Sequence, residues 1–201
     1  MEENNDAPVT ESIPLPPAPE GDAPAICVVG TNRHGPLAAW IEPEEQETSL
    51  EQQIVEAVGP EWEVGAYHSF PSLGKKPSVK DLADISAALG AHDPRLVHWA
   101  CDYFLGDAQQ AVALLAAGYK GYHCSEDAAL IEYAKELIEK NELSKDFLDK
   151  YVDWEAVNSL PVKTETSHLD HLDWERLGYD MRERVLAMEL SGKGVLFNRP
   201  Q

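Results

Sequence analysis

GYKGYHCSEDAALIEYAKELIEKNELSKDFLDKYVDWEAV, residues 118–157, is the stretch that decides the fold of this chain. Ser125 is a good helix N-cap, and the acids at 126 and 127 suit the first turn of a helix because they face its positive end. Apolar residues then recur at the spacing of one helix face: Leu130, Ala134, Leu137 and Ile138. This periodicity predicts a long amphipathic helix with one buried face.

The other face of this predicted helix is acidic. Glu132, Glu136 and Glu139 lie opposite the apolar stripe. After Asn141 a second, shorter helix is predicted to begin at Ser144, and the stretch ends in a cluster of aromatic and acidic residues at 151–155. Few of these side chains are typical of catalysis, so the stretch predicts an acidic surface and not an active site.

Three short patterns in this stretch resemble a known family. They are Tyr-x-Gly-Tyr at 119–122, Ser-Glu-Asp at 125–127 and Val-Asp-Trp-Glu at 152–155. Together they resemble the C-terminal half of the ArdA-type antirestriction proteins. The resemblance implies an elongated, acidic, typically dimeric DNA mimic that blocks the DNA-binding groove of type I restriction-modification enzymes.

The N-terminal part of the chain extends the resemblance to about residues 25–199. The matching features are Gly35, Trp40-Ile41, the run Glu-Trp-Glu-Val at 61–64, Tyr67 and Phe70. The chain departs from the family pattern at 66–68, where the family would carry a further acid beside the aromatic residue. Leu-Asp-Trp-Glu at 172–175 echoes 152–155 but is too short to indicate a structural repeat, and residues 158–171 are consistent with an insertion.

Charge is the most pronounced global property of the chain. The sequence has 36 Asp and Glu against 16 Lys and Arg, a formal net charge of −20. Such a field repels phosphate backbones and attracts basic surfaces, which disfavours direct nucleic-acid binding and favours a basic protein groove as partner. No Lys or Arg lies between Arg33 and Lys75, and eight glutamates fall in that window: Glu42, Glu44, Glu45, Glu47, Glu51, Glu56, Glu61 and Glu63.

Composition divides the chain into four segments. Residues 1–24 contain six prolines and six acids without Lys or Arg, and predict a disordered tail whose removal leaves folding intact. Residues 25–77 predict a small β-sheet carrying one helix, whose start would be a capping box of Thr48 and Glu51. Residues 78–118 predict three short helices, the first starting at Ser78 with Asp81 and the second at Asp93-Pro94, and residues 119–201 predict an α+β C-terminal unit. The expected fold class is α+β, as an elongated chain of three small units.

Size and cysteine content favour an ordinary cytoplasmic protein. No apolar run is long enough to span a membrane, and the N-terminus lacks the pattern of a secretory signal. Cys27, Cys101 and Cys124 have no paired spacing and predict reduced, mostly buried thiols.

Candidate catalytic and metal-binding groups are weak. His168-x-x-His171, with Asp170 and Asp173 nearby, has one helical turn of spacing but lacks further ligands fixed by spacing. His123-Cys124 is a poor nucleophile pair because adjacent residues in extended chain point to opposite sides. We therefore predict no catalytic residue, no cofactor and no metal.

The resemblance and the charge together predict a stoichiometric inhibitor, a homodimer whose surface carboxylates imitate DNA phosphates. Two alternatives remain: an acidic adaptor for another basic DNA-binding protein, and a metal-dependent hydrolase. Besides the eight glutamates above, the candidate phosphate-mimic carboxylates are Asp81, Asp84, Asp102, Asp107, Glu126, Asp127, Glu132, Glu136, Glu139, Glu142, Asp146, Asp149, Asp153 and Glu155.

Overall fold

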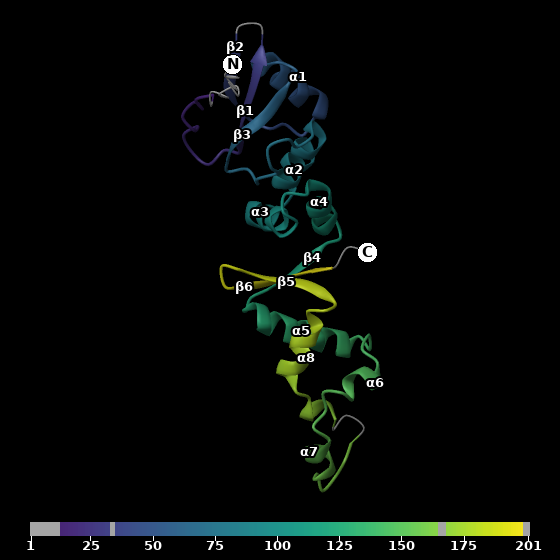
Figure 1. The fold of residues 1–201 in the computed structure, drawn as a ribbon. Coiled ribbons are helices and arrows are strands. Elements are labelled where there is room, and N and C mark those ends of the chain that lie inside the picture. The colour runs from purple at the N-terminus through teal and green to yellow at the C-terminus, as the bar shows by residue number, and fades with distance from the viewer. Residues whose placement is uncertain (1–12, 33–34, 165–167, 199–201) are drawn as a thin grey trace, which may run out of the picture. The chain divides into compact units, whose positions relative to one another are not determined.

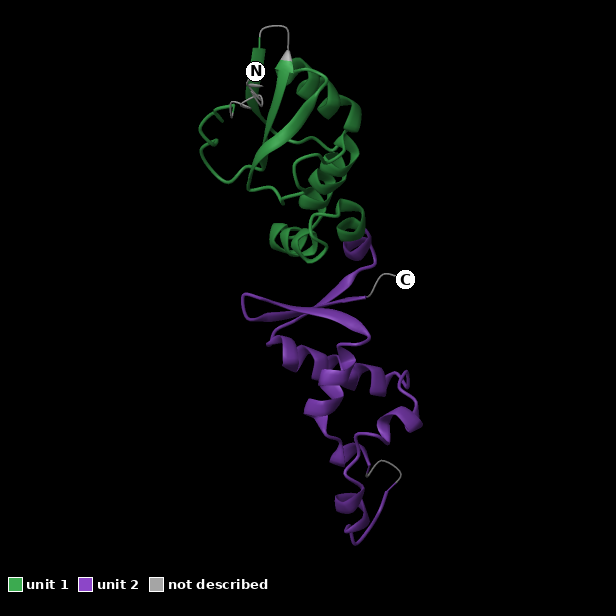
Figure 2. Cartoon of the chain, in the orientation of Figure 1, with its two compact units in different colours: residues 1–112 green, residues 113–201 purple. Residues whose placement is uncertain are grey.

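The computed structural model describes residues 13–32, 35–164 and 168–198. The chain is α+β, as predicted, and divides into two compact units, residues 1–112 and 113–201 (Figure 2). The division falls inside helix α4 (Ala108–Ala116) and lies near the predicted boundary after residue 118. The predicted units 25–77 and 78–118 do not separate in this way: residues 78–112 belong to the same compact unit as residues 25–77, and helix 79–91 (α2) packs there against helix 47–58 (α1).

Unit 1 is built on a three-stranded antiparallel sheet of order β2-β1-β3 (Figure 1). The central strand β1 is buried along most of its length, which explains its continuous apolar sequence. The unit also contains the helices α1, α2 and α3, of which α1 packs on the sheet. The bounds are β1 (Ala25–Asn32), β2 (Gly35–Ile41), α1 (Glu47–Val58), β3 (Trp62–His68), α2 (Val79–Ala91) and α3 (Pro94–Tyr103).

Helix α1 covers one face of this sheet with Leu50, Ile54 and Val58, which are fully buried. The predicted capping box of Thr48 and Glu51 is wrong. Helix α1 begins one residue before Thr48, and its N-cap Gln46 makes no side-chain capping bond. The capping signals of the later helices are confirmed: Ser78 and Asp81 form a reciprocal capping box on α2, and the Asp93 side chain accepts a hydrogen bond from the Arg95 amide at the start of α3.

Residues 13–24 correct the prediction of a disordered tail. They form no helix or strand, but they lie along the face of the sheet that α1 leaves open (Figure 1). The Trp40 indole N–H donates to the carbonyl of Pro16 over 3.1 Å, and the His68 ring is 2.7 Å from the carbonyl of Gly21. These long-range contacts fix the position of the segment. Its amino-acid composition alone does not indicate them. Residues 1–12, the rest of the predicted tail, lie outside the described residues.

Unit 2 contains a second antiparallel sheet, of order β4-β6-β5, and α5 packs against it. Helix α8 crosses α5 where Gly178 approaches Ile131, a contact that leaves no room for a side chain at position 178. The bounds in unit 2 are β4 (Tyr119–Tyr122), α5 (Glu126–Glu139), α6 (Lys145–Leu148), α7 (Trp154–Asn158), η1 (Leu169–His171), α8 (Trp174–Met181), β5 (Val185–Leu190) and β6 (Lys193–Asn198).

The predicted amphipathic helix is confirmed as α5. Ser125 caps it through a hydrogen bond to the Ala128 amide, and Leu130, Ala134 and Leu137 are buried in the core of unit 2. The short helix α6 begins after Ser144, also as predicted. The Trp154 ring is not part of this core, because 42% of the residue is exposed and its indole N–H donates to the Asp149 carbonyl.

The two echoing sequences at 152–155 and 172–175 pair with each other. Val152 and Leu172 form an antiparallel bridge. The Asp153 amide donates to the His171 carbonyl over 2.9 Å, and the Asp173 amide donates to the Tyr151 carbonyl over 2.8 Å. Each Asp then caps the helix that follows it, α7 or α8, with nearly the same backbone angles. The two echoing sequences therefore form a local two-fold arrangement. Residues 153–171 begin and end at this bridge, within unit 2.

None of the helices in the described part of the chain combines the length and apolar character that crossing a membrane requires. The three cysteines are unpaired thiols; Cys27 and Cys101 are buried, as predicted, and Cys124 is half-buried. Burial raises the pKa of the Cys101 thiol to about 12, which keeps it protonated and unreactive.

Candidate functional site

The eight glutamates of unit 1 lie on one continuous piece of chain. Three of them, at 42, 44 and 45, occupy the connection between β2 and α1, and three more lie on the solvent side of α1. All are exposed except Glu63, which is half-buried on β3. The buried stripe of α1 fixes this arrangement, because the residues between Leu50, Ile54 and Val58 must face water.

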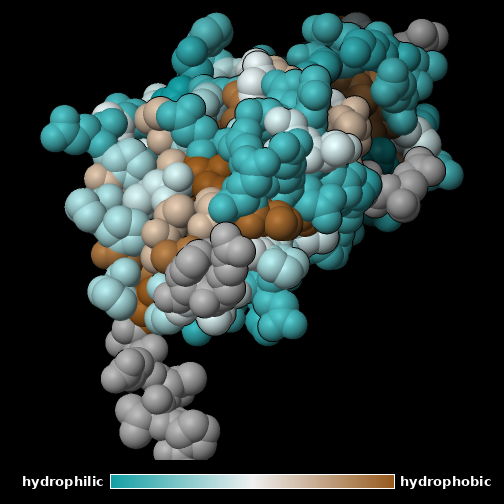
Figure 3. Space-filling view, turned by 90° about the horizontal axis from the view of Figure 1, so that it is seen from above, coloured by the Kyte–Doolittle hydropathy of each residue, from teal (hydrophilic) through white to brown (hydrophobic). Residues whose placement is uncertain are grey.

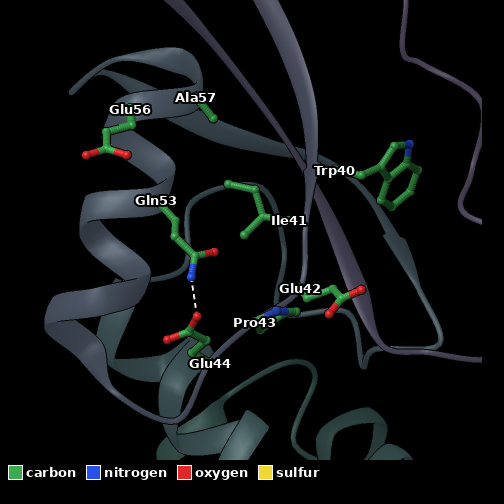
Figure 4. A pocket seen from close by; sticks show the side chains of 8 residues that line it. All are labelled: Trp40, Ile41, Glu42, Pro43, Glu44, Gln53, Glu56 and Ala57. Atoms are coloured by element: carbon green, nitrogen blue, oxygen red, sulfur yellow. Dashed lines mark hydrogen bonds between the residues drawn. The ribbon is translucent and has the colours of Figure 1, made fainter.

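A surface hollow gathers three of these carboxylates. It lies between α1 and the end of β2, and Glu42, Glu44 and Glu56 line it together with Gln53 (Figure 4). The Gln53 amide donates to Glu44, and the Gln52 amide donates to Glu56 over 2.8 Å. Neutral amides thus hold two of the carboxylates in place without cancelling their charge.

No ion pair to any of the eight glutamates occurs among the described residues. Two lysines lie near these glutamates without forming an ion pair with them. The Lys80 pKa is raised mainly by its hydrogen bond with Asp84, and the charge of Glu47 is a smaller cause. Lys76 lines a hollow together with Glu61 and Glu63. Figure 3 shows hydrophilic residues over much of one face, with hydrophobic residues between them. Uncompensated charge of this kind projects a negative field into the solvent.

The predicted carboxylate face of α5 differs in this respect. Glu136 contacts Lys120, lies 3.9 Å from Lys140 and accepts a hydrogen bond from the Tyr122 hydroxyl over 3.2 Å. The Lys120 contact is the main reason that the Glu136 pKa falls below its usual value. Glu132 pairs with Lys135 over 2.7 Å. Among the three predicted glutamates of this face, only Glu139 makes no ion pair with a described residue.

The start of α5 is likewise neutralised. Arg182 approaches Glu126 at 2.9 Å and Asp127 at 2.7 Å. These contacts connect α5 to the segment after α8. Asp127 and Arg182 are 55 residues apart in the sequence. Both acids therefore contribute to tertiary structure in unit 2, and Arg182 balances one of their two negative charges.

The remaining candidate carboxylates fall into two groups. Some cap helices or pair within their own helix: Asp81 in the α2 capping box, Asp84 with Lys80, Asp107 at the start of α4 and Asp153 at the start of α7. The others make no ion pair within the described ranges: Asp102, Glu142, Asp146, Asp149 and Glu155, although Oδ1 of Asp149 is buried there without a hydrogen-bond partner.

One buried hydroxyl of unit 2 is coupled to a carboxylate. Tyr151 donates to Asp180 over 2.6 Å, and burial together with this bond raises the Tyr151 pKa to about 12. The neutral phenol is thus favoured in the folded chain relative to the unfolded one, where the pKa is near 10.

The sign of the resulting pH dependence follows from linkage. Because the folded-state pKa is the higher one, the stabilisation is fully present below about pH 10 and is lost as pH rises through about 12. We expect the melting temperature to fall steeply over this interval, and we expect Tyr151→Phe to flatten the fall while costing about 1 kcal/mol at neutral pH. Thermal melts of both proteins from pH 8 to 12 check this. Equal alkaline slopes would contradict it.

The weak chemical candidates lie around η1 and directly after β4. His168 precedes η1 and His171 ends it. Within the described ranges, no group of three or more His, Cys, Asp and Glu side chains has the geometry to hold a metal ion. His123 is exposed and Cys124 half-buried at the end of β4.

Sequence reasoning missed the residues that hold the segment 13–24, namely Trp40, His68 and Gly65. The prolines of that segment indicated a restricted backbone. The residues that form hydrogen bonds with the segment lie 24 and 47 positions away in the sequence. Comparison with protein-family models gives no match, and comparison with curated protein sequences gives none either. The charges of unit 1 and the motif resemblance are therefore the two features that bear on function.

Proposed function

We propose that this protein is a DNA-mimicking inhibitor of type I restriction-modification enzymes, and that the glutamates between residues 42 and 63 are its main stand-ins for DNA phosphates. The observation that supports this most directly is the absence of ion pairs to these eight exposed or half-exposed carboxylates within the described residues. Their charge is available to a partner protein because no described Lys or Arg side chain forms an ion pair with them.

The physical basis is electrostatic complementarity. A DNA-binding groove is lined with Lys and Arg side chains that neutralise phosphates, and duplex DNA presents one negative charge per about 1.7 Å of axis. On a protein surface with closely spaced carboxylates, the carboxylates can take the place of the phosphates as partners of those Lys and Arg side chains. Such binding requires no catalytic step. Long-range attraction between opposite fields also accelerates the encounter of the two proteins.

The acidic face of α5 takes a secondary place in this proposal. Lys120, Lys135 and Lys140 already balance much of its charge. A basic groove would have to displace these lysines before it could contact Glu132 and Glu136, which lowers the gain per contact. Unit 1 is therefore the expected main contact, whereas the motif resemblance was first seen in unit 2.

The rest of the proposal follows from the resemblance. It includes an extended homodimer, which would lengthen the acidic surface and match a partner with pseudo-two-fold DNA-binding sites. It also includes action in the cytoplasm, where such enzymes meet DNA. No cofactor, metal or catalytic residue is part of the proposed mechanism.

A displacement assay tests the proposal. Purified protein is titrated into a complex of a type I restriction-modification enzyme with labelled duplex DNA, and released DNA is followed by gel shift or filter binding. We expect stoichiometric release of the DNA and no binding of the protein to DNA alone. If the enzyme retains its DNA while another basic DNA-binding protein releases its own, the acidic-adaptor alternative replaces the proposal.

A further inference from the structure

Residues 13–19, Ile-Pro-Leu-Pro-Pro-Ala-Pro, are a conformationally restricted segment, called here the strap. Every residue in it is either a proline or directly precedes one. Proline fixes φ near −65°, and the residue before proline is confined to extended or polyproline II backbone, so the whole strap is held close to a polyproline II helix. A segment of this kind loses little conformational entropy when it binds.

The burial of the strap has the period of a polyproline II helix. Ile13, Pro16 and Pro19 are half-buried, while the residues between them are exposed. A spacing of three residues is one turn of that helix, so one edge of the strap faces the sheet. Leu15 also reaches the sheet but remains 43% exposed, which is typical of a surface ligand and not of a core residue.

The sheet face under the strap contributes specific contacts. Trp40 on β2 donates its indole N–H to the carbonyl of Pro16 over 3.1 Å. Its ring lies on the side of the sheet away from Gln53 and helix α1 (Figure 4), and His68 meets it edge-on at a ring-centroid distance of 6.2 Å. An aromatic ring that donates a hydrogen bond to a proline carbonyl is the chemistry with which Pro-rich peptides are recognised.

Gly65 on β3 provides the space for Leu15. A Cβ atom added at position 65 would lie 2.9 Å from one methyl group of Leu15 and 3.0 Å from a methyl group of Val29. Since the backbone at Gly65 is not in the left-handed region, the clash with Leu15 and Val29 is what opposes a side chain there. Leu15 thus lies against the strand where position 65 carries no side chain, although both residues remain exposed.

We propose that the face of the β2-β1-β3 sheet opposite α1 is a binding site for Pro-rich segments of the Leu-Pro-Pro type, and that the strap occupies this site in cis. Its ligand class is an extended polyproline II peptide with an apolar residue before the first proline of a pair. A short tether gives the strap a local concentration in the millimolar range, so an external peptide binds much more weakly while the strap is in place than after its replacement. This inference does not depend on the proposed inhibitor function.

The test uses the full chain with residues 13–19 replaced by a Gly-Ser sequence of equal length. A peptide of residues 13–24 is titrated into this variant and followed by isothermal titration calorimetry. Reactivity of the Cys27 thiol, mapped by mass spectrometry, is a second measurement, because Cys27 pairs with Trp40 on the strap side of the sheet and is fully buried. We expect saturable binding of the peptide, and a Cys27 thiol that reacts in the variant and is protected again by the peptide.

Matched controls separate a site from general apolar contact. Adding Gly65→Ala or Trp40→Phe to the strap-replaced chain should weaken peptide binding at least tenfold, and the natural chain should bind the peptide at least tenfold more weakly than the strap-replaced chain. A peptide carrying Leu15→Asp should not bind. Absence of peptide binding, equal binding of the Leu15→Asp peptide, or unfolding of the strap-replaced chain would each overturn the proposal, the last because it would make the strap a permanent part of the core.

Discussion

Replacing Glu42, Glu44, Glu51 and Glu56 together by Gln is expected to weaken the inhibitor about tenfold at physiological salt while leaving its melting temperature unchanged or slightly higher. The four side chains are exposed and make no ion pair with the described residues, so their charge contributes self-repulsion to the folded chain. Gln preserves the size and an acceptor oxygen, which maintains the amide contacts of Glu44 and Glu56.

The salt dependence of binding gives the sharper measurement. Each phosphate-like contact that is lost should reduce the slope of log affinity against log salt by about one. The control is Glu132→Gln, Glu136→Gln and Glu139→Gln in α5, which removes the pairs with Lys120, Lys135 and Lys140. We expect this control to lower the melting temperature by about 1–3 °C and to change the salt slope less. If the control has the larger effect on inhibition, the main contact lies on α5.

Leu130→Ala is expected to destabilise unit 2 by about 2–5 kcal/mol. The Leu130 side chain is fully buried in the core that α5 shares with α8 and the second sheet, so its removal loses apolar burial and leaves a cavity. A loss of this size is a large part of the stability of an ordinary domain. Denaturant titration of the variant, followed by circular dichroism, measures it.

Trp154→Ala is the matched surface control. Its ring is larger than the leucine side chain, but the residue is 42% exposed and donates one hydrogen bond, to the Asp149 carbonyl. We expect a loss below about 1 kcal/mol. A larger loss for Trp154→Ala than for Leu130→Ala would show that the core of unit 2 is centred on α7 instead of α5.

Local signals in the sequence predicted the local structure of α2, α3 and α5 correctly. Ser78, Asp93 and Ser125 each accept hydrogen bonds from amides within three residues, so a short window contains all the information that fixes these helix starts. Helix α1 departs from this rule, since it begins one residue before Thr48 with a Gln at the N-cap and no capping bond. Packing of Leu50, Ile54 and Val58 on the sheet supports that helix, and packing overrides capping preference.

Non-local contacts account for what the sequence did not reveal. The strap has the composition of a disordered tail, and contacts with Trp40 and with the strand at Gly65, far along the chain, give it a fixed place. The candidate site shows the same limit. The acidity of α5 was predictable, and so were its local pairs with Lys135 and Lys140, but the contacts of Lys120 and Arg182 form only on folding. Among the described residues the glutamates at 42–63 make no ion pair, which agrees with the local lack of Lys and Arg in that window.

The bridge between Val152 and Leu172 bears on how this chain can vary in length. Because residues 153–171 depart from and return to adjacent backbone positions, joined by hydrogen bonds of 2.9 and 2.8 Å, residues can be added or lost within 158–164 without moving α5 or α8. Natural variants are expected to differ in length at this point before any other part of unit 2. The same property makes it a suitable position for a fused reporter.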